Sequence, residues 1–120
     1  MNLTFEKLFE LFYGKSPQTI KALGLCEKYG LDKPPTYIRD HTIEFGKMMN
    51  ISKDHVKVVR HRLDGPAVLK KSGDTVWFIN GRYVNHLIID WAKDTDIDLD
   101  NLTDVDKALI KLTWSDYGKT

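Results

Sequence analysis

Two histidines and an aspartate are the residues of this sequence best suited to acid–base chemistry. His55, His61 and Asp64 lie in one ten-residue stretch. An imidazole can move a proton near neutral pH, so the two histidines, together with Lys57 or Arg60, could carry out the acid–base step of a small nuclease. The two histidines would share a face only on a strand, because their separation is even. No serine or cysteine nucleophile accompanies them, so we expect surface histidines, no catalytic residues and no enzyme.

Basic residues gather in the middle of the chain. Between positions 47 and 71, seven lysines and arginines stand against two aspartates, a local charge of +5 in a chain of net charge +1. Such a patch attracts phosphates or an acidic protein surface. The residues predicted to bind nucleic acid or a partner are Ser52, Lys53, Lys57, Arg60, Arg62, Lys70 and Lys71.

Aspartates gather further along. Between positions 90 and 106, seven aspartates stand against one lysine, a local charge of −6. Their alternate spacing resembles the start of a calcium loop, but Leu99 and Val105 occupy the positions at which an EF-hand needs glycine and glutamate. We therefore expect no metal and no cofactor. The predicted acidic partner face consists of Asp94, Asp96, Asp98 and Asp100.

The basic segment has two structural interpretations. Residues 45–62 fit a helix-turn-helix, in which Gly46 allows a close helix crossing, Asn50 makes the turn and Ser52 caps the second helix. That reading predicts a DNA-binding regulator with lysines and arginines near phosphates. However, the run from His55 to Val59 is rich in β-branched residues that alternate with polar ones, which favours a strand. Both interpretations stay open from the sequence.

The other elements predict an α+β fold in a single domain, residues 1–120. Residues 1–60 are expected to be mainly helical, with Thr4 and Ser16 capping two N-terminal helices. Residues 61–84 are expected to form a small antiparallel β-hairpin or meander, in which Asn80-Gly81 makes a type I′ turn. Two helices are expected in residues 85–118, the second capped by Thr103, with Ile97 and Leu99 turned into the core.

A family resemblance enters at the hairpin. The segment HRLDGPAV at 61–68, with Gly73, Trp77 and Ile79-Asn80-Gly81, resembles the MORN-like "HREDGPA…W..NG" repeat of small proteins from tailed bacteriophages. The resemblance covers about 20 residues, and the chain carries one copy where many members of the family carry several. It implies a structural β-hairpin unit, a phage-type origin and a role in handling the host cell. A single copy must pack on the helices, because it has no second copy to stack on.

Composition limits the function further. One cysteine excludes an internal disulfide or a cysteine-based zinc site within a monomer, and no unbroken apolar run is long enough to span a membrane. We expect a cytoplasmic chain without membrane contact, in the host bacterium if phage-encoded. The expected function is a non-catalytic binding protein that modulates a host macromolecule, with a host protein as partner. The alternatives are a DNA-binding regulator that uses residues 45–62, and more distantly a small nuclease or a small-ligand-binding protein that uses Trp77 and Tyr83. Oligomeric state stays open.

Overall fold

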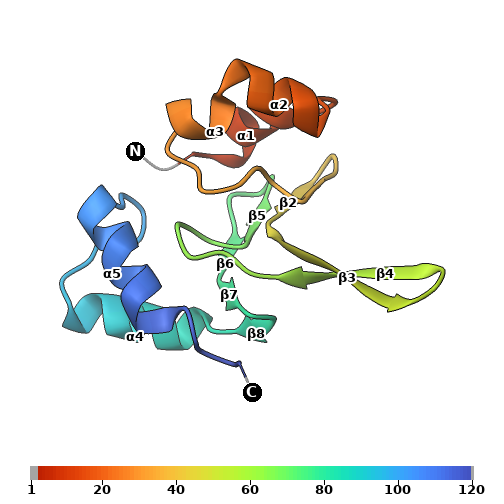
Figure 1. The fold of residues 1–120 in the computed structure, drawn as a ribbon. Coiled ribbons are helices and arrows are strands. Elements are labelled where there is room, and N and C mark those ends of the chain that lie inside the picture. Colours follow the sequence, from red (N-terminus) through yellow and green to blue (C-terminus); the bar gives the residue numbers. More distant parts are fainter. Residues whose placement is uncertain (1–2, 120) are drawn as a thin grey trace.

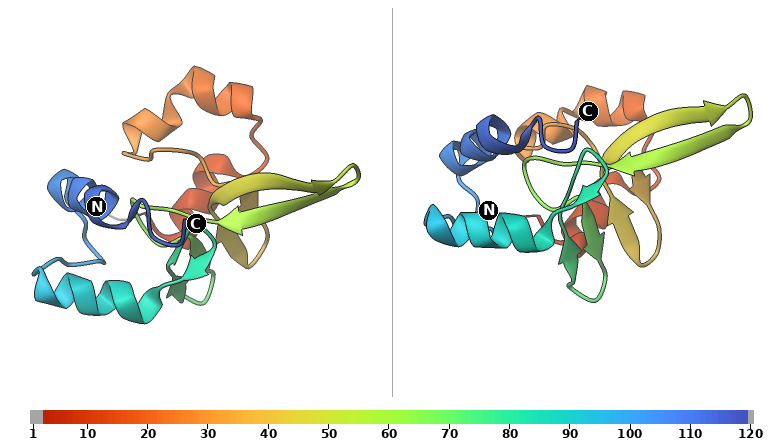
Figure 2. Two further views of the ribbon diagram at one scale, coloured as in Figure 1. Left: turned by 60° about the horizontal axis from the view of Figure 1, so that its bottom comes forward. Right: turned by 90° about the horizontal axis from the view of Figure 1, so that it is seen from below.

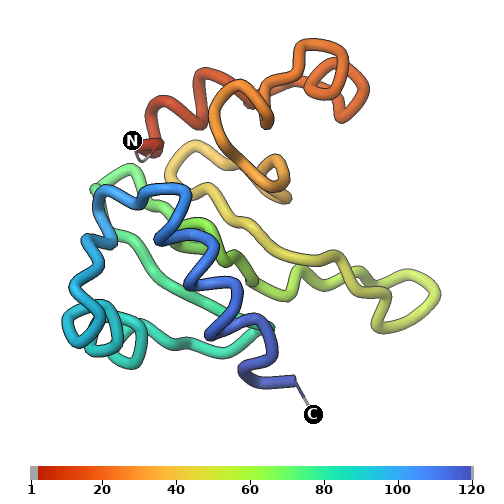
Figure 3. Tube along the Cα trace, turned by 60° about the vertical axis from the view of Figure 1, so that its left-hand side comes forward, coloured from red at the N-terminus to blue at the C-terminus, as the bar shows by residue number. Residues whose placement is uncertain are grey.

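The computed structural model describes residues 3–119 and confirms an α+β fold. N-terminal helices, a central group of short antiparallel strands and two C-terminal helices follow one another along the chain (Figure 1). The strands lie between the two groups of helices, as the tube trace also shows (Figure 3). In the part of the chain that the structure describes, no helix combines the length and the hydrophobicity needed to cross a membrane.

Three short helices open the chain. α1 (Phe5–Phe12) begins at Thr4, whose hydroxyl accepts a hydrogen bond from the backbone N–H of Lys7, so the predicted cap is confirmed. α2 (Pro17–Leu23) begins at the predicted Ser16 cap with proline in its first turn. It ends at Gly24, which adopts φ +61°, and α3 (Leu25–Lys28) follows. Three N-terminal helices are therefore present where the sequence predicts two, because the chain changes direction at this left-handed residue.

A four-stranded antiparallel sheet supports these helices. Its spatial order is β1 (Tyr37–Ile38), β2 (Thr42–Glu44), β5 (Val68–Lys70) and β6 (Thr75–Val76). Because side chains alternate along a strand, Ile43 and Leu69 point to the helices, whereas their neighbours point the other way. The first hydrophobic cluster combines these residues with apolar side chains of the helices and of two connecting segments: Phe5, Leu8, Phe12, Ile20, Leu25, Leu31, Ile43, Phe45 and Leu69.

Residues 45–62 do not form a helix-turn-helix. β3 (Gly46–Ser52) and β4 (His55–Arg60) pair antiparallel as a separate two-stranded sheet, with a register irregularity between Asn50 and Ser52. The β-branched valines of β4 favour this pairing. Gly46 does mark a close approach, but of a strand: a Cβ there would lie 2.2 Å from the carbonyl oxygen of Val59. The expectation that residues 1–60 are mainly helical is likewise wrong after Lys28, where strands take over.

The predicted hairpin unit and C-terminal helices are present. β7 (Phe78–Ile79) and β8 (Arg82–Tyr83) flank the Asn80-Gly81 turn, whose φ values of +50° and +81° are those of a type I′ turn. α4 (Asn85–Asp94) and α5 (Asp104–Trp114) follow, and Thr103 caps α5 in a reciprocal capping box with Asp106. The second hydrophobic cluster contains Trp77, Ile79, Val84, Ile88, Leu102, Ile110 and Trp114, with Ile97 and Leu99 packed against it as predicted.

Candidate functional site

The β3–β4 hairpin, residues 46–60, projects from the body of the protein, and we call it the arm. It extends away from all of the helices in Figure 1 and in both views of Figure 2. Four of its apolar side chains face solvent: Met48 is 64% exposed, Met49 54%, Ile51 63% and Val56 53%. Isolated scattered apolar residues are common on protein surfaces, but four on one projecting hairpin are a concentration of exposed apolar surface that marks an interaction site.

The register gives the arm two chemically different faces. Met48 pairs with Val58 and Asn50 with Val56, so these side chains share one face, which is mainly apolar. Lys47 pairs with Val59 and Met49 with Lys57 on the other face, which alternates lysines with apolar side chains and which we call the basic face. The lysine and aspartate at the tip, Lys53 and Asp54, form the turn between the strands. An apolar stripe and a pair of lysines are thus presented on opposite faces of the arm.

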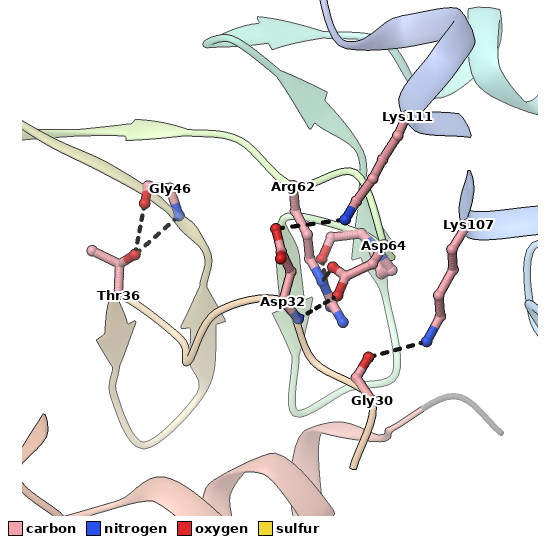
Figure 4. A network of polar contacts seen from close by, with 9 residues as sticks. Gly30, Asp32, Thr36, Gly46, Arg62, Asp64, Lys107 and Lys111 are labelled. Carbon is pink, nitrogen blue, oxygen red and sulfur yellow. Dashed lines mark hydrogen bonds and ion pairs between the residues drawn. The ribbon is translucent and has the colours of Figure 1, made fainter. Parts of the chain in front are cut away.

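Two sets of side-chain contacts fix the base of the arm to the body of the protein. The hydroxyl of Thr36 donates to the carbonyl oxygen of Gly46 at 2.9 Å and accepts from the N–H of the same residue at 3.0 Å (Figure 4). At the end of β4, the Arg60 guanidinium pairs with Glu44 and lies 5.3 Å from the centre of the Phe78 ring. These contacts hold the first and last residues of the arm against the four-stranded sheet and the β7–β8 hairpin.

A groove of about 550 Å³ lies where the arm meets the sheet, and we call it the basal groove. Its floor comes from the sheet face turned away from the helices, and its wall comes from β4. Three cationic side chains and one carboxylate line it together with Tyr37 and two valines. The lining residues are Tyr37, Arg39, Thr42, Glu44, Val58, Arg60, Val68 and Lys70. Because Val58 belongs to the apolar face of the arm, the groove and that face form one continuous surface.

The predicted binding residues are distributed over several places. Ser52, Lys53 and Lys57 are exposed on the arm, and Arg60 and Lys70 meet in the basal groove. Lys71 lies outside the basal groove, lining two other hollows beside α1. The acidic residues Asp94, Asp96, Asp98 and Asp100 are exposed in and before the α4–α5 connection, at the opposite end of the molecule from the arm (Figures 1 and 2).

Arg62 has a structural position rather than a binding one. Its side chain is only 9% exposed, its Nε donates to Asp64 at 2.7 Å, and its Nη1 donates to the carbonyl of Pro66 at 3.0 Å. The guanidinium also lies 4.0 Å from the centre of the Phe45 ring. No large partner can reach this cation in the folded protein, so the expectation that Arg62 binds one is wrong. Charge along a sequence does not reveal that a cation is buried against its own carboxylate.

The buried pair joins segments that are far apart in the sequence. Asp64 accepts a further hydrogen bond from the N–H of Asp32 at 3.1 Å, and Lys111 of α5 approaches the Asp32 carboxylate at 3.7 Å (Figure 4). Lys107 of the same helix donates to the carbonyl of Gly30 at 3.2 Å. Burial opposes the charge of Asp64, but Arg62 and the Asp32 N–H overcome it and hold the pKa of Asp64 below its usual value.

The repeat-like residues make one structural unit. The imidazole of His61 accepts, at Nδ1, a hydrogen bond of 2.8 Å from the N–H of Asn80, and the Asn80 amide donates to the carbonyls of Ser115 and Tyr117. Gly65 does not adopt a positive φ, but a Cβ there would lie 2.7 Å from Cζ of Arg62, so the position has little space for a side chain. The HRLDGPA segment and the Asn80-Gly81 turn are thus joined by their own polar groups.

The positions of the histidines do not suit joint acid–base catalysis. His55 and His61 lie at opposite ends of β4, about 20 Å apart from the rise of a strand. Burial and the nearby lysines lower the pKa of His61, whose Nδ1 already accepts a hydrogen bond from the N–H of Asn80.

Burial and neighbouring carboxylates raise the pKa of the Cys26 thiol, so it is protonated at neutral pH and a poor nucleophile. Among residues 3–119, no group of three or more histidine, cysteine or acidic side chains is placed to hold a metal ion.

Trp77 and Tyr83 do not present a common stacking surface. Trp77 is 4% exposed and belongs to the second hydrophobic cluster, whereas Tyr83 is 56% exposed and packs edge-on against Phe78.

Comparison of the chain with protein-family models, with curated proteins and with solved structures finds no match. The exposed apolar residues of the arm, which the sequence analysis did not include among the predicted binding residues, are the strongest local indication of function. Their signal in the sequence was the alternation of Val56 and Val58 after a polar Ser-Lys-Asp turn.

Proposed function

We propose that this chain is a small non-catalytic binding protein that holds a host protein through the arm. The observation that carries the proposal is the exposure of Met48, Met49, Ile51 and Val56 on a hairpin that projects from the body. A lone two-stranded hairpin is marginally stable in water, and covering one of its faces adds the packing that it lacks. Methionine is common at protein interfaces because its flexible, polarizable side chain adapts to the opposite surface.

The resemblance to the phage repeat supports the host-directed part of the proposal. The repeat-like residues hold the fold together: His61 accepts from Asn80, and Arg62 is buried against Asp64. This use agrees with the structural role that the resemblance implies for the hairpin unit. We therefore assign partner binding to residues outside the hairpin unit. Among these, the arm carries the largest set of exposed apolar side chains. We place the protein in the host cytoplasm, where it would modulate its partner by occupying a surface.

A capture experiment with matched variants tests the proposal. The tagged chain is incubated with bacterial lysate, and retained proteins are quantified for wild type, for Met48→Asp with Ile51→Asp, and for Leu112→Asp. Leu112 is 83% exposed on α5 and serves as the control for placing a charge at an exposed apolar position. We expect a stoichiometric protein that the Leu112 variant retains and the arm variant loses. Equal retention by the arm variant, or no stoichiometric protein with wild type, would contradict the proposal. Circular dichroism spectra establish that each variant is folded.

A second candidate function is DNA binding by the arm, favoured by its basic face. Lys47 and Lys57 lie on that face, and the major groove of DNA is wide enough to admit a two-stranded ribbon. In this case binding to duplex DNA falls steeply with salt. Lys47→Ala with Lys57→Ala should reduce the slope of log K against log salt by about 2. Lys21→Ala with Lys93→Ala is the control with equal loss of charge away from the arm. Absent or salt-insensitive retention of DNA would exclude this function.

A further inference from the structure

We propose that the basal groove binds an extended acidic segment of the protein partner. The inference rests on the proposed function and adds the chemistry of the segment that is recognised: carboxylates in the groove and apolar side chains along the adjoining arm. The groove is the place where the cations of the sheet and of β4 converge around a hollow.

The charge of the groove selects an anion. Arg39, Arg60 and Lys70 line it, against the single carboxylate of Glu44. Glu44 is already paired with Arg60. Within residues 3–119, neither Arg39 nor Lys70 lies within ion-pair distance of a carboxylate, so both charges are available to a ligand. Two available cations beside a satisfied ion pair favour a segment with carboxylates at two or more positions.

The apolar part of the surface selects a peptide. Val58 and Val68 line the groove, and Val58 continues onto the arm face that carries Met48 and Val56. In an extended peptide, successive side chains point to opposite sides, so alternate residues can all contact one surface. A peptide whose surface-facing positions are carboxylates along one half and aliphatic residues along the other half therefore meets the cations of the groove and then the apolar side chains of the arm. The face of the arm is seven residues long in β3, about 23 Å, which an extended segment of seven or eight residues spans.

The aromatic rings near the groove argue against single-stranded nucleic acid. Such ligands are held by bare aromatic faces on which successive bases stack. Here the guanidinium of Arg39 lies 4.6 Å from the centre of the Tyr37 ring, and that of Arg60 lies 5.3 Å from the Phe78 ring. Each ring thus supports a cation on one face instead of offering it to a base. The stacked guanidinium groups are held in place for carboxylates.

The test uses defined probes. A fluorescein-labelled decapeptide with aspartate at positions 1, 3 and 5, leucine at positions 7 and 9 and serine at the other positions is titrated with the full chain, and binding is followed by fluorescence anisotropy at 50 and 500 mM NaCl. The same peptide with asparagine for aspartate and a ten-nucleotide oligothymidylate are the comparison ligands. The groove variant is Arg39→Ala with Lys70→Ala. Its controls are Arg39→Lys with Lys70→Arg, which keeps both charges, and Lys21→Ala with Lys93→Ala, which removes two charges elsewhere.

We expect the aspartate peptide to bind, and to bind more weakly at 500 mM NaCl because salt screens exposed charges. The groove variant should raise its Kd by about fivefold, as expected for two exposed ion pairs, and both controls should stay near wild type. Equal Kd values for wild type and the groove variant would overturn the inference. Tighter binding of the oligothymidylate would overturn it in favour of nucleic acid.

The lysate capture separates this inference from the proposed function. The groove variant can retain the captured protein as well as wild type does and also bind the peptide with the same Kd as wild type. The groove then has no role in binding, although the arm keeps its proposed function. If the peptide result holds but lysate capture is insensitive to the arm variant, the groove inference stands and the proposed function of the arm fails. Changes in the NMR chemical shifts of backbone amides on addition of the peptide locate its binding site directly. Shifts at 37–44 and 68–70 support the groove, and shifts confined to 48–56 contradict it.

Discussion

Replacing Asp64 with alanine tests whether the buried ion pair stabilises the fold as its geometry indicates. The substitution removes the acceptor of two hydrogen bonds, at 2.7 Å from Arg62 and 3.1 Å from the N–H of Asp32. It leaves the Arg62 side chain, only 9% exposed, without a counter-charge. Removal of one partner from a buried pair destabilises proteins by about 3–5 kcal/mol. For a domain of this size, that corresponds to a decrease in Tm of about 12–20 °C.

Urea and thermal unfolding followed by circular dichroism measure this loss. Glu44→Gln is the matched control, because it breaks a pair whose arginine side chain is 47% exposed, and should lower the free energy of unfolding by less than about 1 kcal/mol. Arg62→Met with Asp64→Ala should be more stable than Asp64→Ala, since it removes the uncompensated charge. If Asp64→Ala lies within about 1 kcal/mol of wild type, the reasoning from burial is refuted.

The same pair predicts an acid limit of stability. The pKa of Asp64 is lowered in the fold, so the unfolded chain takes up a proton at this group before the folded chain does. Its stabilising contribution is therefore complete above the ordinary carboxyl pKa of about 3.9 and is lost as pH falls through the lower folded value. In Asp64→Ala this component of the acid unfolding curve should be missing.

Three further predictions concern single residues. Gly46→Ala should displace β4, because the added Cβ would lie 2.2 Å from the Val59 carbonyl oxygen, and partner capture should fall, while Lys21→Ala, an exposed substitution in α2, leaves capture unchanged. The pKa of His61 is lowered by burial and by lysines, so the unfolded chain binds the proton first and stability should fall as pH drops below about 6.5; thermal melts of His61→Asn should lack this dependence. Thr103→Ala should lower the free energy of unfolding by about 1 kcal/mol through loss of the α5 cap, whereas Thr113→Ala, within the same helix, should lower it less; equal urea midpoints would contradict the role of the cap.

Local signals in the sequence predicted local structure well. The caps Thr4, Ser16 and Thr103 and the Asn80-Gly81 turn are confirmed, because each depends on the backbone preference of one or two residues. The burial of Ile97 and Leu99 between exposed aspartates is confirmed for the same kind of reason, since alternation is a local pattern.

The arm and the buried pair depend on non-local contacts and were harder to predict. Gly46 and Asn50 fit the small and turn positions of a helix-turn-helix, whereas the actual contact at Gly46 is with a strand 13 residues later. Arg62 adds to a basic run when charges are counted, but only the fold reveals that Asp64 neutralises it. The basal groove joins residues 37–44 with 58–70, and its existence follows from strand order rather than from any motif.

The position of the arm within the sheet topology has a consequence for how fast the chain folds. β2 pairs with β5, so Glu44 must meet Val68 across 24 positions, and the arm lies inside this connection. A hairpin is a local structure that forms in microseconds. Once the arm has formed, the loop that must close contains only Phe45 and residues 61–67, which reduces the entropic barrier by about 1 kcal/mol. Substitutions that weaken the pairing of Asn50 with Val56 should therefore slow refolding more than they accelerate unfolding. The segment that we assign to partner binding thus also accelerates formation of the central sheet during folding.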